Sequence, residues 1–541
     1  MKRIFLLLPL LWISGISNAQ VFTSSNLPII IINTNGQAIP DDPKITADMG
    51  IIYNGVGVRN NVTDPMNHYN GKIGIETRGQ SSQMFPMKSY GIELRDIAGN
   101  SQDKALFGLP KESDWVLYAP YTDKTLMRNF LAYTMSREMG HWAANCRYVE
   151  VVVDGDYKGI YVFMEKIKRG SGRVNISKMA ATDIGGDEVT GGYIFSLDKQ
   201  PDGWFSSYIA PGSTNGNKRQ FSYVYPKIEN IVQQQKDYIK SYVDSFENAL
   251  AGPQFQDPVA GVRKFADIPS FIDYFIVDEI SRNVDGYRLS SYFYKSRNSK
   301  NAKIFAGPVW DYDLSFRNAD YCDGSNITGW AYDFNNICPG DGAGLIPFWW
   351  NSFMKDTAFK SDLRCRWKQL RNTSLGEARF TTLIDSVSNL INEAQQRHFQ
   401  RWPILGQYVW PNPQPIPTTY EGEIGSLKAW LSARLQWIDA NLPNSGVCAD
   451  YPREVKESII ISLSPSPFPA NSSIAIRSRV AQAVQLNVFD AAGRKVYGAK
   501  HNLSVGYNTV NILSGQWNTG VYFFSFTSQA GEKLVLKAIK Q

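Results

Sequence analysis

Residues Asp278–Phe316 read DEISRNVDGYRLSSYFYKSRNSKNAKIFAGPVWDYDLSF, and this stretch decides the predicted fold. It begins inside an apolar-periodic run that follows Asp267, a favourable N-cap residue, so we expect a helix from Asp267 to about Asn283. Two β-rich runs follow, LSSYFYKS and AKIFAGPVW. The polar turn RNSKN separates them, which predicts a β-hairpin directly after the helix.

Three carboxylates lie at the ends of this predicted hairpin. Asp285 stands where the helix turns into the hairpin, and Asp311 and Asp313 stand where the hairpin ends. Because the two ends of a hairpin lie close in space, we expect Asp285 and Asp311 to face one cavity. Mg²⁺ is typically held by one or two carboxylates together with substrate phosphates, and phosphoryl transfer also needs a carboxylate that orients the attacking hydroxyl. The spacing fits such a site, and it equally fits a surface hairpin with ordinary turn aspartates.

A second candidate segment is RGQSSQMFPMKSYGIEL, which begins at Arg78 and lies between two predicted strands. A glycine turn exposes backbone N–H groups, Ser81 adds a hydroxyl, and Arg78 offers a bidentate fork for phosphate. Lys88, at the start of the second strand, would add a point charge at the same place. An ordinary hairpin with two exposed cations would show the same pattern.

Four segments together resemble the CotH kinase family, the spore-coat-protein-H-like atypical kinases. They are RGQSSQMFPMKSYGIEL, DGDYKGIYVFMEKI, NVDGYR and GPVWDYDLSF, and they occur in the family's order between about Gly71 and Arg371. The resemblance implies an α+β fold with an atypical kinase-like, two-lobed core. Its N-terminal part would be β-rich and its C-terminal part helical.

The resemblance also implies roles for the acidic residues. Asp285 would be the catalytic residue that orients an acceptor hydroxyl, while Asp311 and Asp313, with Asn283, would hold Mg²⁺ or Mn²⁺. Two features differ from protein kinases, because no His-Arg pair precedes Asp285 and no Asn lies five residues after it. The second metal ligand therefore rests on Asn283, which lies just before the catalytic residue.

For the nucleotide, the resemblance implies that ATP is bound through its phosphates by Arg78, Ser81 and Lys88. Glu165 leaves a predicted strand where a kinase-like fold has its hinge, so it is the expected contact of the adenine base.

The N-terminus predicts export. Met1-Lys2-Arg3 is followed by the apolar run IFLLLPLLWI and by small residues up to Ala19, which together are typical of a signal peptide, residues 1–19. No other run approaches about 18 apolar residues, so we expect no transmembrane segment in the mature chain. Residues 20–70 are expected to form a β-rich region and residues 71–447 the kinase-like domain.

The C-terminal part changes in composition near Cys448, which predicts a linker at residues 448–463 and a small β-sandwich at residues 464–541. The segments VFDAAGRKVY, LSGQWNTGVYFF and KAIKQ resemble the C-terminal sorting domain of type IX secretion substrates. The resemblance implies that the type IX secretion machinery is a partner and that the protein is secreted or attached to the cell surface.

Composition excludes several classes of function. The formal net charge of +6 is small for 541 residues, so nucleic acid is not an expected partner. The five cysteines lack the spacing of a zinc site, and in an exported protein Cys322 and Cys338 are candidates for a disulfide. None of the four histidines lies near a serine or cysteine motif, which argues against a His-based catalytic triad.

The leading prediction is a CotH-like, ATP-dependent protein kinase that transfers the γ-phosphate to Ser or Thr of an exported protein. One alternative is a non-catalytic surface or structural protein in which these aspartates, with Asp320, Asp323 and Asn326, hold a structural Ca²⁺. Another is a carbohydrate-active enzyme that uses two carboxylates beside its many aromatic residues. Only the kinase requires the cations Arg78 and Lys88 near the carboxylates.

Overall fold

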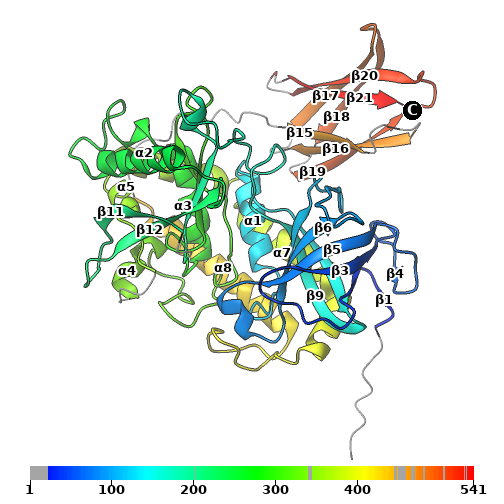
Figure 1. Cartoon of the computed structure of the whole chain (residues 1–541), viewed down its shortest axis with the longest axis horizontal. Coiled ribbons are helices and arrows are strands. Elements are labelled where there is room, and N and C mark those ends of the chain that lie inside the picture. The colour runs from blue at the N-terminus through cyan, green and yellow to red at the C-terminus, as the bar shows by residue number, and fades with distance from the viewer. Residues whose placement is uncertain are drawn as a thin grey trace, which may run out of the picture. The chain divides into compact units, whose positions relative to one another are not determined.

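The computed structural model describes residues 22–199, 202–338, 344–443, 448, 459–464, 468, 471–478, 482–503, 506–528, 531 and 533–540. The predicted signal peptide and most of the predicted linker lie outside these residues. The described part contains both helices and strands and is therefore α+β (Figure 1). The chain divides into two compact units, of which the first comprises Met1–Ala119, Arg147–Phe163 and Leu390–Pro403 and the second the rest.

Seven strands of the first unit close into a barrel in the order β2-β3-β5-β6-β7-β9-β8 (blue to cyan in Figure 1). The strands are β2 Ile29–Asn33, β3 Ile45–Ile52, β5 Tyr69–Arg78, β6 Ser89–Arg95, β7 Asp114–Tyr118, β8 Cys146–Val153 and β9 Asp156–Glu165. The short strands β1 Ser24–Ser25 and β4 Asn60–Asn61 form a separate pair. A parallel pairing of β2 with β8 closes the barrel. Residue 70, where the sequence suggests a boundary, lies within β5.

The second unit is built around a helix that is buried along almost its whole length. The helix predicted to begin at Asp267 is α3, Ile268–Ser281, and its N-cap Asp267 accepts a hydrogen bond from the backbone N–H of Ser270 at 3.0 Å. It packs against α1 (Arg128–Glu138), α6 (Thr357–Arg371) and α8 (Tyr420–Asn441). The other helices of this unit are α2 Gln233–Ala251, α4 Phe334–Ile337 and α5 Trp349–Phe353, while α7 Glu377–Arg401 belongs to the second unit up to Asn389 and to the first from Leu390. Short 3₁₀ helices are η2 Glu188–Thr190, η3 Val262–Lys264 and η4 Ala331–Asp333 in this unit and η1 Ser81–Met84 in the first.

The predicted hairpin after α3 is confirmed. It consists of β13 (Ser291–Lys295) and β14 (Ile304–Ala306), which pair antiparallel with Phe293 opposite Ala306. The two strands form the edge of a five-stranded sheet of order β11-β12-β10-β13-β14. The other members are β10 Tyr193–Leu197, β11 Gly203–Ile209 and β12 Lys218–Tyr225. This sheet and α3 together fix both ends of the segment that carries the three aspartates.

The described part of the second unit contains two disulfide bonds. Cys322 and Cys338 are bonded, as predicted from the sequence. A second bond joins Cys365 on α6 to Cys448, which the sequence analysis did not anticipate because 83 positions separate the two cysteines. Cys146 is buried, and its Sγ donates to the carbonyl oxygen of Ala144 at 3.7 Å.

The C-terminal residues form two antiparallel sheets, β15-β16-β19 and β18-β17-β20-β21 (orange to red in Figure 1). Their strands are β15 Ile459–Ser464, β16 Asn471–Ser478, β17 Gln482–Asp490, β18 Lys495–Leu503, β19 Gly506–Leu513, β20 Gly520–Ser528 and β21 Lys533–Lys540. Phe468 and buried residues from both sheets share one apolar cluster. The first strand starts inside the predicted linker, because the apolar run IIISL precedes the Pro/Ser-rich stretch.

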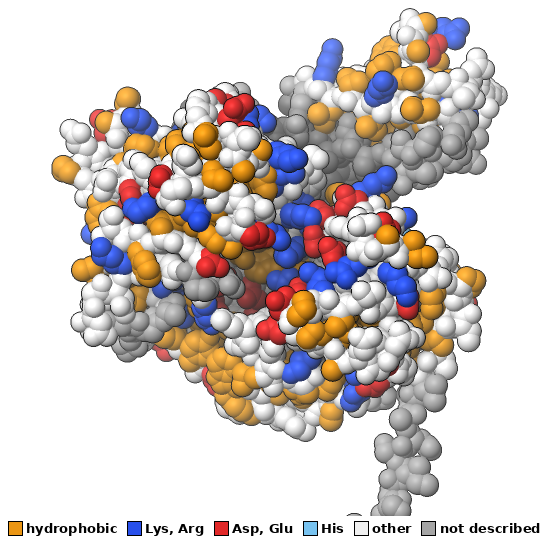
Figure 2. Space-filling model, in the orientation of Figure 1, with side chains coloured by type: hydrophobic (Ala, Val, Ile, Leu, Met, Phe, Trp, Pro, Cys, Tyr) orange, Lys and Arg blue, Asp and Glu red, His pale blue; other side chains and the backbone are white. Residues whose placement is uncertain are grey.

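The surface and the helices agree with the composition. On the face shown in Figure 2, Lys and Arg side chains are intermixed with Asp and Glu side chains, as a small net charge leads one to expect. Within the described residues, the helices all lack the length or the apolar character needed to cross a membrane.

Candidate active site

The turn after α3 is built around Asp285. The side-chain oxygen Oδ1 of Asn283 accepts the backbone N–H of Asp285 at 3.2 Å, and the carbonyl oxygen of Asp285 accepts the N–H of Leu289 at 2.9 Å. A Cβ at Gly286 would lie 2.9 Å from Oδ1 of Asp278, so glycine is needed for this close approach. These contacts hold the turn, and the Asp285 side chain has 22% of its surface exposed.

Asp311 is held from two other elements. Its backbone N–H donates to the hydroxyl of Tyr133 on α1 at 3.2 Å. Its Oδ2 accepts the hydroxyl of Ser290, which belongs to the Asp285 turn, at 3.4 Å. The next residue is fixed as well, because the N–H of Tyr312 donates to Oδ1 of Asn129 at 2.6 Å. The two ends of the hairpin are thus tied together, as the sequence predicts.

Residues with a strained backbone are concentrated between Arg282 and Asp323. Of the twelve described non-glycine residues with positive φ, eight lie between Arg282 and Asp323. Asp311 has φ +65°, and the bulky residues Tyr287 and Phe316 have φ +66° and +48°. Such conformations cost free energy and persist where the surroundings over-determine them, as at many functional sites.

The three carboxylates repel one another. Burial raises the pKa of Asp313 well above its ordinary value, and the charges of Asp311, Asp285 and Asp123 raise it further. Burial also raises the pKa of Asp285, against the opposing effect of Arg288 and Lys199. A set of partly buried like charges is favourable only with a cation or a proton among them.

These groups do not by themselves form a complete metal site. Among the described residues, no group of three or more His, Cys, Asp or Glu side chains is arranged so that it could hold a metal ion. A Mg²⁺ ion that takes further ligands from substrate phosphates and water needs only one or two carboxylates. Asn283, predicted as a ligand, already uses Oδ1 to fix the Asp285 turn.

The predicted phosphate contacts lie together at one end of the barrel. Arg78 pairs with Ser89 across β5 and β6, so Lys88 adjoins the same end. The Nζ of Lys88 donates to the carbonyl oxygen of Gln83 at 2.5 Å, and Ser81 is exposed at the start of η1. The turn depends on Gly79, whose φ is +100°. Arg78, Ser81 and Lys88 thus lie at one hairpin end, and their contact with ATP stays a prediction.

Glu165 is fully buried and has partners of its own. Its Oε2 accepts the backbone N–H of Asn145 at 2.9 Å and the side-chain amide of Asn145 at 2.7 Å. Its Oε1 lies 3.7 Å from Nε of Arg173. The carboxylate therefore ties together segments of the second unit, and any contact with adenine would come from the backbone.

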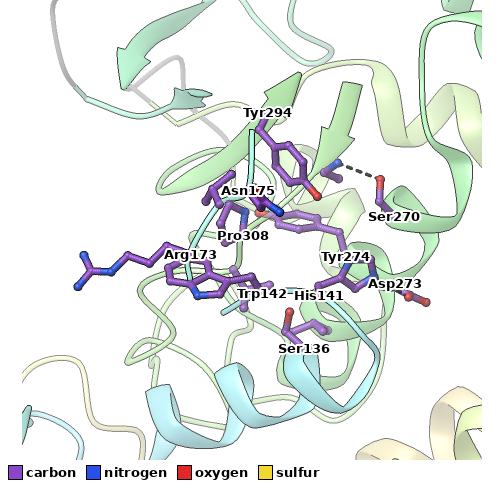
Figure 3. Close-up of a pocket in the computed structure, with 15 residues that line it drawn as sticks. Ser136, His141, Trp142, Arg173, Asn175, Ser270, Asp273, Tyr274, Tyr294 and Pro308 are labelled. Atoms are coloured by element: carbon purple, nitrogen blue, oxygen red, sulfur yellow. Dashed lines mark hydrogen bonds and ion pairs between the residues drawn. The ribbon is translucent and has the colours of Figure 1, made fainter. Parts of the chain in front are cut away.

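A cavity of about 160 Å³ adjoins the segment that leads to Asp311. Figure 3 shows Trp142, Tyr274, Tyr294 and Pro308 around it, and the guanidinium of Arg173 points away from it. Its lining is largely aromatic and apolar, so it differs in chemistry from the carboxylate cluster.

Residues 75–438 match the family described as CotH kinase protein, and residues 466–541 match the secretion system C-terminal sorting domain. The chain belongs to the CotH kinase family. Its sorting domain directs it through the type IX secretion machinery to the cell surface or the extracellular space. A search of curated proteins gave no match.

In this CotH-family chain, several residues at the site escaped the sequence analysis. Asp123 forms a buried ion pair with Arg128 and caps the start of α1, and the Nε of Arg128 donates to the carbonyl oxygen of Ser315 at 3.1 Å. Tyr133 positions Asp311. The run DKTLM directly before α1 contains Asp123, which is a common residue near helix starts, but nothing in the run indicates a contact almost two hundred residues away.

Asp320, Asp323 and Asn326, the residues predicted to help hold Ca²⁺ in the alternative interpretation, lie in a loop that contacts within the protein stabilise. Asp320 accepts the hydroxyl of Tyr408 at 2.7 Å, and the carbonyl oxygen of Asp323 accepts the Nε of Arg282 at 2.9 Å. The disulfide between Cys322 and Cys338 closes the same loop. These contacts stabilise the loop, and Ca²⁺ binding there stays a prediction.

Proposed function

We propose that the chain is an ATP-dependent protein kinase that transfers the γ-phosphoryl group to Ser or Thr of an exported protein. The observation that carries the proposal is the convergence of Asp285, Asp311 and Asp313, which is close enough that the first two raise the pKa of the third. In this proposal the barrel unit and the helical unit are the two lobes of a kinase-like core. Family membership supports the reaction class.

A divalent cation fits the acidic cluster. Asp313 is partly buried among like charges, and Asp311 is held in position by Tyr133 and Ser290. Asp311 and Asp313 would hold Mg²⁺ or Mn²⁺, with Asn283 acting mainly on the Asp285 turn. When bound, the ion would neutralise charge on the phosphates of ATP.

Asp285 would act on the acceptor. The acceptor hydroxyl oxygen forms a bond to the γ-phosphorus, and the bond from that phosphorus to the oxygen bridging to the β-phosphorus breaks, with its electron pair leaving on ADP. The hydroxyl proton passes to the carboxylate of Asp285. A raised pKa, caused first by burial, makes this carboxylate a better proton acceptor than an ordinary aspartate.

Arg78, Ser81 and Lys88 would hold the nucleotide phosphates. A glycine turn with a hydroxyl and two cations at one hairpin end supplies the donors that phosphate oxygens accept.

The test is transfer of label from γ-labelled ATP by the purified mature chain with Mg²⁺ or Mn²⁺. Casein and the chain itself would serve as acceptors, and Asp285→Asn as the matched inactive variant. We expect label in protein with the wild type and a loss of at least a hundredfold with the variant. Equal labelling by both proteins, or none by the wild type with either metal, would contradict the proposal.

A further inference from the structure

Two arginines beside Asp285 have no role in the site described above. Arg219 lies on β12 and Arg288 in the turn three residues after Asp285, and their exposed fractions are 7% and 8%. The Nη2 of Arg219 donates to the carbonyl oxygen of Arg288 at 2.6 Å. The Nη1 of Arg288 donates to the carbonyl oxygen of Gly344 at 3.1 Å, and its Nη2 lies 3.9 Å from Oδ1 of Asp285.

Both side chains keep unused donors. The Nε atoms of Arg219 and Arg288 are buried and have no hydrogen-bond partner. Each guanidinium has five N–H donors, and a buried donor without a partner costs free energy. A buried guanidinium whose Nε–H has no acceptor has donors left for an anionic partner.

The surrounding charges do not supply that partner. Among the described residues, Asp198, Lys199 and Arg219 interact with Asp285 or Arg288, and Asp285 also interacts with Asp313 of the carboxylate cluster. Burial and the neighbouring charge of Arg288 lower the pKa of Arg219 to about 10, and Asp198 opposes the shift. The 3.9 Å separation between Arg288 and Asp285 is too long for a hydrogen bond. Among the described residues, neither arginine therefore has a carboxylate as a hydrogen-bond partner.

We propose that Arg288, positioned by Arg219, binds a phosphoryl group beside Asp285. A guanidinium is planar and matches the oxygens of a phosphoryl group with two parallel hydrogen bonds, which an ammonium cannot do. The site adjoins the carboxylate that would receive the hydroxyl proton, so its occupant lies at the reaction centre. This inference rests on the proposed kinase function and adds a residue to it.

The phosphoryl group can come from two sources. It is the transferring group itself, whose bond to the acceptor oxygen forms while its bond to ADP breaks, or it is a phosphate already carried by the acceptor near the target hydroxyl. In the first case Arg288 stabilises charge that develops during transfer, so its loss lowers kcat for every acceptor. In the second case its loss raises KM for phosphorylated acceptors alone.

Kinetics separate the two sources. We would compare Arg288→Met, Arg288→Lys and the wild type on one Ser-containing peptide and on the same peptide with a neighbouring phosphoserine. The first source predicts that Arg288→Met loses at least a hundredfold in kcat on both peptides, with Arg288→Lys intermediate. The second predicts that only the preference for the phosphorylated peptide disappears. Unchanged kcat and unchanged preference in Arg288→Met would overturn the proposal.

Arg219 is a positioning residue, so its variants have a separate expectation. Arg219→Lys keeps a donor for the carbonyl oxygen of Arg288, so its kcat and its peptide preference should stay close to those of the wild type. Arg219→Met should change the quantity that Arg288→Met changes, either kcat or the peptide preference, by a smaller factor. Lys300→Ala is the control, because it removes an exposed cation from the turn between β13 and β14. An Arg219→Met variant that changes only thermal stability would remove Arg219 from the proposal.

A second measurement does not depend on kinase activity. Inorganic phosphate should raise the melting temperature of the full chain above the value in chloride of equal ionic strength. In Arg288→Met the rise in melting temperature caused by phosphate should be smaller than in the wild type. Lys88→Met should keep the part of the rise that Arg288→Met loses. If the wild type transfers no phosphate, the proposed function fails while this comparison still tests the anion site. If Arg288→Met does not fold, Arg288→Lys replaces it in this measurement. A phosphate-dependent rise in melting temperature that is as large in Arg288→Lys and Arg219→Met as in the wild type would overturn the proposed anion site.

Discussion

The hydroxyl of Tyr133 on α1 accepts the backbone N–H of Asp311 at 3.2 Å, so a helix far away in the sequence fixes the conformation of the acidic segment. Asp311 has φ +65°, which few residues other than glycine adopt without support. The hydroxyl of Tyr133 therefore holds the carboxylate of Asp311 in place through its backbone and does not need to touch a substrate.

Tyr133→Phe removes this hydroxyl and keeps the ring that stacks on Trp310. The N–H of Asp311 would lose its partner, which costs about 1–3 kcal/mol in a buried site. We expect the protein to fold, with a lower melting temperature and a Mg²⁺ requirement for transfer raised about tenfold, which corresponds to ~1.4 kcal/mol. Tyr69→Phe is the matched control, because it removes a tyrosine hydroxyl that donates to the carbonyl oxygen of Lys72 in the barrel. An unchanged Mg²⁺ requirement in Tyr133→Phe would show that the contact is only structural.

Lys88→Met tests the predicted phosphate contact. The change removes the charge and one hydrogen bond to Gln83 but keeps the length of the side chain, so folding should survive. ATP affinity or turnover should fall at least about tenfold, or ~1.4 kcal/mol. Lys72→Met, which removes a half-exposed lysine elsewhere on the barrel, should leave both unchanged. Equal ATP kinetics in the two variants would mean that Lys88 is an ordinary surface cation.

Local signals in the sequence were sufficient for the segment that carries the site. Asp267 with Pro269 marks the start of α3, and alternating β-rich residues around a polar turn mark β13 and β14. A helix that enters a hairpin directly places Asp285 near Asp311, which is why the pairing of the two hairpin ends could be predicted. The disulfide between Cys322 and Cys338 is likewise local.

Long-range contacts escaped the sequence analysis. The barrel closes through β2 and β8, which lie more than a hundred residues apart, and no local pattern specifies that pairing. Helix α2 was overlooked although its buried residues Ile239, Val243, Phe246 and Leu250 follow helical spacing. The contacts that Tyr133 and Arg219 make at the site depend on such tertiary packing, so residue type alone did not distinguish them.

The buried carboxyl of Glu247 on α2 should make stability depend on pH. Burial raises its pKa to about 7, although Ser206 and Trp349 donate hydrogen bonds to it. Because the folded state then binds a proton more tightly than the unfolded state, stability is highest below the unfolded pKa and falls as pH rises from about 4.3 to the folded value. Glu247→Gln should remove this fall, worth up to about 3 kcal/mol above pH 7.

Urea unfolding of Glu247→Gln and the wild type between pH 5 and pH 8 would measure the effect. The exposed Glu229→Gln is the control for a change of charge. A stability difference between Glu247→Gln and the wild type that stays constant with pH would exclude a titrating Glu247.

Removal of the C-terminal sheets tests the sorting assignment. The cut belongs before Ile459, because a cut at Ser464 would leave β15 without its partner strand β16 and expose an edge. The disulfide between Cys365 and Cys448 lies upstream and is retained. We expect the truncated chain to fold and to remain inside the cell envelope, while Asp285→Asn with an intact tail is exported normally. Normal amounts of the truncated chain at the cell surface would contradict the assignment.

Substitution of the two aspartates separates catalysis from metal binding. Asp285→Asn should keep binding of ATP and Mg²⁺ and lose transfer, because an amide cannot take the hydroxyl proton. Asp311→Asn removes a carboxylate ligand, so Mg²⁺ binding, nucleotide binding and transfer should weaken together. If the cluster instead holds a structural Ca²⁺, both variants should lose a Ca²⁺-dependent rise in melting temperature, because a bound ligand stabilises the folded state by mass action. Nucleotide titrations and melting curves with and without Ca²⁺ on both variants decide between these outcomes, and intact transfer by Asp285→Asn would exclude it as the catalytic residue.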